Sequence, residues 1–224
     1  MNLRFRINQL KNTFFFKEKK KYKWIFVYGV PRSGTTYFYQ ELLQLSKFGV
    51  SDYDLGKFIP VINHIQQSTY IPIDTDALKN FLSEQLLIHT APGGGNEYDF
   101  IVKQVNTNLE EYQLLCELMG SEPEEKYFLY RAPNGWLSSA MKKFSISAID
   151  AELVYRSSLE SFDEIRGTRI KYGKSLYNSL FVLGVKPNQE FIVSESKNDL
   201  ISDSLLSLFK DFEEKSYVNT EIKV

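Results

Sequence analysis

Cysteine and histidine are scarce in this chain. One cysteine, Cys116, and two histidines occur among 224 residues. A single cysteine excludes an internal disulfide, and so few thiol and imidazole groups cannot build a structural zinc site on their own. We therefore expect no required metal and a protein of a reducing compartment, which we take to be the cytoplasm.

Long apolar runs are missing as well. No stretch reaches the roughly eighteen apolar residues that a membrane-spanning helix needs. Near the start of the chain the apolar residues end at Phe14-Phe15-Phe16, directly before the charged run 17–23, so the core of a secretion signal is not evident. The sequence predicts neither a membrane span nor a secretion signal.

Charge of either sign is not in excess. Lysine and arginine number 27 against 28 acidic residues, which leaves a formal net charge of −1. The protein as a whole therefore has no electrostatic reason to bind nucleic acid, and any anion site must be local. Hydrophobic residues at 43% and charged residues at 25% are ordinary globular values. The length favours one domain over 1–224, with 1–22 as a peripheral segment.

Short apolar runs alternate with amphipathic segments along the chain. The runs typical of buried strands are Trp24 to Tyr28, Phe100 to Val102, Tyr127 to Tyr130 and Phe191 to Val193. The segments with helical spacing are Leu109 to Met119, Trp136 to Phe144 and Leu205 to Phe212. This alternation predicts an α/β fold of three layers, with a central parallel sheet covered by helices on both faces.

Other stretches are assigned from periodicity and composition alone. Phe38, Leu42 and Leu45 predict a helix that continues to Gly49. The stretches 54–90 and 147–184 carry helical patterning and are expected to be helical insertions around a cleft. The turn-rich run 91–96, with three glycines, is expected to be a mobile loop.

The residues Gly29-Val30-Pro31-Arg32-Ser33-Gly34-Thr35-Thr36 link the first predicted strand to a helix. Their G-x-x-x-x-G spacing is that of a P-loop, in which backbone N–H groups and a helix N-terminus surround an anion. Thr35 stands where a nucleoside-triphosphate enzyme needs lysine. The hydroxyls of Ser33, Thr35 and Thr36 and the charge of Arg32 suit an anionic ligand, so the loop predicts a phosphate-like site without the NTPase lysine.

Arg131 follows the strand 127–130 directly, and Ser139 lies eight positions later. Ligands of open α/β sheets bind at the carboxyl ends of the strands, so Arg131 is expected to face the same crevice as the loop 29–36. Arginine and serine can together hold one phosphate. The pattern predicts a second anion contact in the same crevice.

Together these segments resemble the sulfotransferases that use 3′-phosphoadenosine 5′-phosphosulfate (PAPS). Pro31 to Thr36 is similar to the 5′-phosphosulfate loop of carbohydrate, tyrosyl-protein and bacterial members, and Tyr130 to Ser139 is similar to the 3′-phosphate motif. Val102-Lys103 followed by Asn106 resembles a lysine-containing strand end of the family. Asn134 departs from the acidic residue often found in the second motif, and the glycine-rich C-terminal loop of the cytosolic animal enzymes is not recognisable.

The resemblance implies the cofactor, the product and the site residues. PAPS would be the sulfuryl donor and adenosine 3′,5′-bisphosphate the product. The implied donor-binding residues are Arg32, Ser33, Gly34, Thr35, Thr36, Arg131 and Ser139. Arg32 would also stabilise charge on the leaving group. The acceptor would be a hydroxyl of a carbohydrate or another small metabolite, and its general base is expected to be Asp52, with Asp54 as the second candidate.

Two other functions remain open from the sequence. A kinase or NTPase with a degenerate P-loop would bind ATP and Mg²⁺, but it needs a substitute lysine and a metal-holding carboxylate at a strand end. The second strand ends near Lys103 and the third at Arg131, so no such carboxylate is evident there. A non-catalytic relative would bind adenosine 3′,5′-bisphosphate without transferring anything.

Overall fold

A six-stranded, mostly parallel sheet forms the centre of the protein. The computed structural model describes residues 21–52, 90–187 and 201–215. The strands are β1 (Trp24–Gly29), β2 (Ser46–Val50), β3 (Ala91–Pro92), β4 (Tyr98–Val105), β5 (Glu125–Tyr130) and β6 (Thr168–Lys171), in the order β3-β2-β4-β1-β5-β6. Among these six described strands, only β3 runs antiparallel to its neighbour. This is the α/β fold with a central parallel sheet that the sequence predicts.

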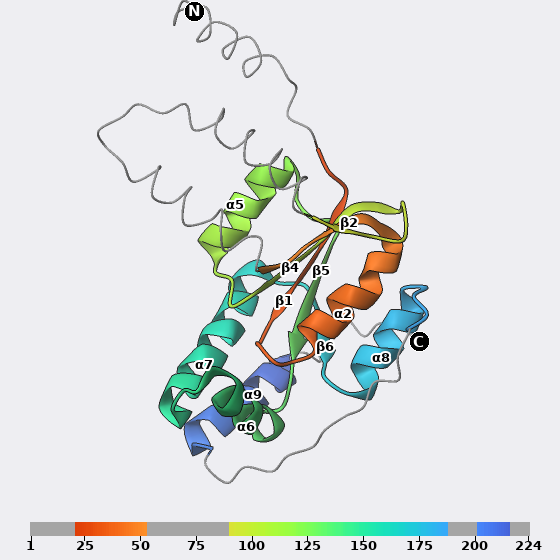
Figure 1. The fold of residues 1–224 in the computed structure, drawn as a ribbon. Coiled ribbons are helices and arrows are strands. Elements are labelled where there is room, and N and C mark those ends of the chain that lie inside the picture. Colours follow the sequence, from red (N-terminus) through yellow and green to blue (C-terminus); the bar gives the residue numbers. More distant parts are fainter. Residues whose placement is uncertain (1–20, 53–89, 188–200, 216–224) are drawn as a thin grey trace, which may run out of the picture.

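Helices cover both faces of this sheet (Figure 1). On one face lie α2 (Thr35–Leu42) and α8 (Lys174–Val182). On the other lie α5 (Leu109–Met119), α6 (Pro133–Phe144), α7 (Ala148–Ile165) and α9 (Asp203–Glu214). The strand β1 is buried along its whole length, with Ile25 and Val27 in the α2 core and Trp24, Phe26 and Tyr28 in the other. A strand enclosed on both faces reads as one continuous apolar run, which is why the sequence revealed it.

The helix expected to reach Gly49 ends earlier. Helix α2 stops at Leu42, a 3₁₀ turn spans Leu43–Leu45, and β2 follows at once. A Cβ atom on Gly49 would lie 2.4 Å from both Leu43 and the Tyr39 hydroxyl. Gly49 therefore lets the helix pack closely on its own following strand, and the prediction that it ends the helix is wrong.

The segment 147–184, which the sequence predicts to be helical, also contains a strand. Helices α7 and α8 fill most of it, but β6 lies between them and pairs with β5. Only Ile170 of this strand is buried. Because Arg169 and Lys171 alternate with it, the segment lacks the apolar signature of the other strands.

The glycine-rich run 91–96 is held by backbone hydrogen bonds. The amides of Gly93, Gly94 and Gly95 donate to carbonyls of Lys47, Leu43 and Ser46 at 2.8–3.0 Å. These glycines serve close packing on the 43–47 segment, and the mobility expected of the run stays a prediction. The predicted strand at 191–193 and most of the helical stretch 54–90 lie outside the described residues. In the described part of the chain, no helix is long and apolar enough to cross a membrane.

Candidate anion-binding site

A cavity of about 450 Å³ lies at the carboxyl edge of the sheet. All five strands that run parallel contribute to it, either from their last residues or from the loop that follows. Its walls are Pro31, Arg32, Gly34, Thr35, Thr36, Tyr37, Asp52, Lys103, Val105, Arg131, Ser139, Lys143, Phe144 and Tyr172. The helices after β1 and β5, α2 and α6, lie on opposite faces of the sheet (Figure 1). Open α/β sheets bind ligands at such a point, where neighbouring connections diverge.

The loop between β1 and α2 is fixed by its backbone. Gly29 has φ of 135°, and a Cβ atom there would lie 2.1 Å from the carbonyl oxygen of Leu129 in β5. The next amide, that of Val30, donates to the same oxygen at 2.9 Å. Only glycine permits this approach, so the first glycine of the motif ties the loop to the neighbouring strand.

The start of helix α2 faces the cavity. Gly34 caps the helix in the left-handed conformation with φ of 84°, and no side chain caps the helix there. The helical hydrogen bonds start with the Phe38 amide, which donates to Gly34 at 2.9 Å. The amides before it have no helical acceptor, and they carry the positive end of the helix dipole. This end of the helix suits a group of negative oxygens.

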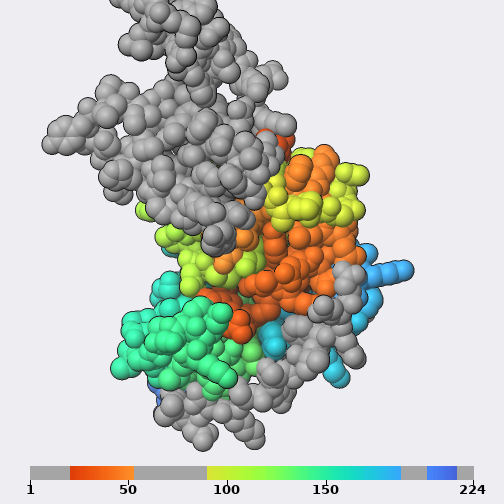
Figure 2. Space-filling view, in the orientation of Figure 1, coloured from red at the N-terminus to blue at the C-terminus, as the bar shows by residue number. Residues whose placement is uncertain are grey.

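The two sequence motifs meet in space. Arg32 Nε donates to Ser139 Oγ at 3.3 Å, across 107 positions of sequence. The indole N–H of Trp136, in the first turns of α6, donates to the carbonyl oxygen of Pro31. Figure 2 shows the orange surface of the segment around β1 and α2 beside the teal surface of α7, the helix that follows α6. One ligand can therefore contact both motifs.

Arg131 is held rigidly at the end of β5. It is only 7% exposed, and its guanidinium lies over the Tyr172 ring at 4.3 Å from the centroid. Its carbonyl accepts a 2.6 Å hydrogen bond from the Tyr155 hydroxyl. Burial raises the pKa of Tyr155 well above its ordinary value, so this phenol stays a neutral donor. A Cβ on Gly135 would lie 3.0 Å from Arg131 Nε, so glycine there leaves room for the guanidinium.

Lys103 contacts both the loop 29–36 and Asp52. This β4 residue is buried, and its Nζ donates to Thr36 Oγ1 at 3.1 Å. The same Nζ lies 2.7 Å from Asp52 Oδ1, just beyond the end of β2. The strands β2 and β4 are parallel neighbours, so the residues that follow β2 lie beside the last residues of β4. The cavity thus contains four cationic side chains and one carboxylate.

Most of the predicted site residues lie together. Those that line the cavity are Arg32, Gly34, Thr35, Thr36, Asp52, Arg131 and Ser139. Ser33 is fully buried and does not line it; its hydroxyl has no hydrogen-bond partner among the described residues. Asp54 lies outside the described residues. The roles assigned to all of these residues remain predictions.

Several residues that shape the cavity were not predicted as site residues from the sequence. They are Lys103, Lys143, Trp136, Tyr155 and Tyr172. Lys103 carried a signal, because a charged residue near the end of an apolar strand lies at the ligand edge of a parallel sheet. Lys143 stands four positions after Ser139, one helical turn farther along α6. Tyr172 carried none, since its strand was itself unrecognised.

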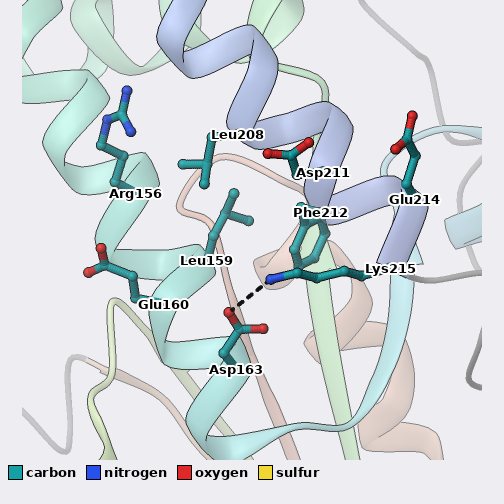
Figure 3. Close-up of a pocket in the computed structure, with 9 residues that line it drawn as sticks. All are labelled: Arg156, Leu159, Glu160, Asp163, Leu208, Asp211, Phe212, Glu214 and Lys215. Atoms are coloured by element: carbon teal, nitrogen blue, oxygen red, sulfur yellow. Dashed lines mark ion pairs between the residues drawn. The ribbon is translucent and has the colours of Figure 1, made fainter.

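A second hollow of about 380 Å³ lies between α7 and α9 (Figure 3). Its polar side chains are Glu160, Asp163, Asp211, Glu214, Arg156 and Lys215, around an apolar floor of Leu159, Leu208 and Phe212. Lys215 Nζ lies 3.8 Å from Asp163. Four carboxylates against two cations do not suit an anion. In the part of the chain that the structure describes, no group of three or more histidine, cysteine or carboxylate side chains is arranged to hold a metal ion.

Three solved structures are remotely similar to this chain. No protein-family model and no curated protein matches the chain. A sulfotransferase domain of a Synechococcus olefin synthase is 15% identical with a TM-score of 0.47, over 93% of this chain and 92% of that one. A Janibacter sugar kinase is 15% identical with a TM-score of 0.40, over 74% and 96%. A Chloroflexus aurantiacus protein described as a putative kinase is 13% identical with a TM-score of 0.38, over 91% and 100%. None of these likenesses decides the function.

Proposed function

We propose that this protein is a sulfotransferase that moves the sulfuryl group of PAPS to a hydroxyl of a carbohydrate or another small metabolite. The observation that carries the proposal is the Arg32 to Ser139 contact, which brings both sulfotransferase-like motifs to one cavity. Four cations and one carboxylate line that cavity. This excess of positive charge suits PAPS, which carries one anionic group at the 3′ position of its ribose and another at the 5′ position.

The residues present fit such a donor. The amides at the start of α2, with Thr35, Thr36 and Arg32, would hold the 5′-phosphosulfate. Arg131 and Ser139 would hold the 3′-phosphate. Arg131 is already oriented by Tyr172, so little side-chain entropy is lost when it binds. An arginine fork fixed in this way favours a planar, bidentate contact with phosphate oxygens.

The transfer needs a base and charge stabilisation. The acceptor oxygen forms the new bond to sulfur while the bond from sulfur to the 5′-phosphate oxygen breaks, and that oxygen keeps the electron pair. The acceptor's proton goes to Asp52, the carboxylate that lines the cavity. Arg32 and the loop amides stabilise the growing charge on the leaving phosphate. The products are a sulfate ester and adenosine 3′,5′-bisphosphate.

The place of Lys103 supports this proposal over a kinase. In P-loop NTPases the hydroxyl after the lysine position, here that of Thr36, binds Mg²⁺. In this protein the Lys103 ammonium donates a hydrogen bond to that hydroxyl and also pairs with Asp52. A protein-supplied cation thus stands beside the hydroxyl that would hold the metal. This supports a donor bound without Mg²⁺, and it disfavours ATP–Mg²⁺.

The test is binding followed by turnover. Calorimetric titration with adenosine 3′,5′-bisphosphate should show micromolar affinity, and ATP–Mg²⁺ should bind at least about tenfold more weakly. Ser139→Ala should weaken the bisphosphate about tenfold through loss of a hydrogen bond to a charged group. Its neighbour Ser138 is on the same helix but does not line the cavity, so Ser138→Ala is the matched control.

Transfer of labelled sulfate from PAPS to a panel of hydroxyl compounds then separates an enzyme from a non-catalytic relative. Binding with no turnover on any acceptor would favour the non-catalytic relative. Preference for ATP–Mg²⁺, or no binding of the bisphosphate, would overturn the proposal and favour the kinase.

A further inference from the structure

We infer that Asp52 and the anionic end of the donor share one cation, Lys103, so that donor binding and release of the Asp52 carboxylate are coupled. The inference rests on the proposed function and goes beyond it. It makes Asp52 a residue that restrains donor affinity in addition to acting as the base.

The geometry of Lys103 carries this inference. Its ammonium has three N–H donors. One is used by Thr36 at 3.1 Å, and Asp52 lies 2.7 Å away in an ion pair. Thr36 belongs to the first turn of α2, where the free amides suit an anion, so the Lys103 ammonium lies at the same helix end. An anion on that helix end and Asp52 therefore lie on either side of one ammonium group.

Because Lys103 is buried, sharing its charge between Asp52 and a ligand weakens its attraction to each of them. The Lys103 side chain is 9% exposed, while that of Asp52 is 36% exposed. Water therefore compensates Lys103 poorly, and the charge of Asp52 offsets part of the attraction that Lys103 exerts on a ligand. Asp52 therefore opposes donor binding through Lys103.

The coupling has a consequence for the reaction. When negative oxygens at the helix end draw Lys103 toward themselves, the ion pair with Asp52 weakens. The carboxylate is then available to take the acceptor's proton, and only while the donor is in place. The pair would thereby order the two events, donor binding first and proton acceptance second.

A double-mutant cycle tests the shared cation with adenosine 3′,5′-bisphosphate as the probe. The variants are Asp52→Asn, Lys103→Met and the double variant, each titrated by calorimetry in the same buffer. Asp52→Asn should bind the bisphosphate about three- to tenfold more tightly than the unchanged protein, although it loses sulfate transfer. Lys103→Met should bind more weakly. In the Lys103→Met background, Asp52→Asn should change affinity by less than about twofold.

A merely structural role of Asp52 predicts the opposite sign, because local damage weakens binding. Asp52→Ala serves as a second variant and should also tighten binding. Unchanged or weaker binding in both Asp52 variants would overturn the inference. Equal tightening with and without Lys103 would overturn it as well, because the Asp52 charge would then act on the ligand directly and not through Lys103. If the unchanged protein does not bind the bisphosphate at all, the proposed function itself fails, which is a different outcome.

Discussion

At the scale of single residues, Gly29 sets the position of the loop 29–36. Its φ of 135° and its contact with the Leu129 carbonyl combine backbone strain with lack of space. Gly173 offers a matched case, because its φ is 119° but nothing lies within 4 Å of the Cβ position. Comparing alanine substitutions at these two glycines therefore separates the cost of backbone strain from the cost of steric overlap.

We predict that Gly29→Ala lowers the free energy of unfolding much more than Gly173→Ala does. Gly173→Ala should cost about 1–3 kcal/mol from backbone strain alone. Gly29→Ala should cost at least about 2 kcal/mol more, because β5 must move away from the loop. Urea denaturation followed by circular dichroism measures both. Equal losses would mean that the close approach to Leu129 adds nothing.

At the scale of elements, the glycine run after β3 acts as a backbone clasp on β2. A Cβ atom on Gly93 would lie 2.0 Å from the Ser46 carbonyl oxygen, whereas one on Gly94 would have its nearest neighbour at 3.6 Å. Both amides donate hydrogen bonds to the 43–47 segment. Adjacent glycines in one run thus differ sharply in the space around them.

Gly93→Ala should destabilise the protein by about 2–4 kcal/mol, and Gly94→Ala by less than about 1 kcal/mol. The reason is that alanine at 93 pushes against backbone atoms of β2, which cannot rotate away. Thermal unfolding of the two variants, side by side, measures the difference. A Gly93→Ala variant as stable as Gly94→Ala would show that the backbone around Ser46 can move to accommodate the added methyl group at little cost.

Element by element, the sequence predicted what apolar periodicity can reveal. The strands β1, β4 and β5 and the helix α5 were found because each buries an uninterrupted run or one helical face. The strands β2 and β6 were missed for a physical reason. Gly49 looks like a helix end but serves close packing. In β6 the Arg169 guanidinium lies over the rings of Phe162 and Phe212, so a charged residue occupies a position where the strand pattern requires an apolar one.

The site shows the same limit. Arg131 and Ser139 could be predicted because their spacing is a local motif, and the loop 29–36 likewise. The contacts of Lys103 with Thr36 and Asp52 depend on the strand order, in which β4 lies between β1 and β2. Strand order is a property of the folded chain, so single-sequence patterns could suggest Lys103 but could not place it.

At the scale of the whole molecule, charge is nearly balanced but unevenly placed. The formal net charge is −1, yet four cations and one carboxylate line the cavity. Long-range attraction of an anion by the protein as a whole is therefore weak, and the local cations dominate. Exposed charges are screened over about 10 Å at 0.1 M salt, while buried ones are screened much less.

Lys142 and Lys143 allow this balance to be tested. Both are exposed lysines in the last turn of α6, but only Lys143 lines the cavity. Raising NaCl from about 50 to 500 mM should weaken binding of adenosine 3′,5′-bisphosphate by about tenfold in the unchanged protein. Lys143→Ala should reduce both the affinity at low salt and this salt dependence, since it removes the exposed part of the local field. Lys142→Ala should leave both unchanged within about twofold. If the two variants respond alike in calorimetric titrations at the two salt concentrations, attraction comes from the general charge of the surface, and the cavity does not concentrate the field as its lining suggests.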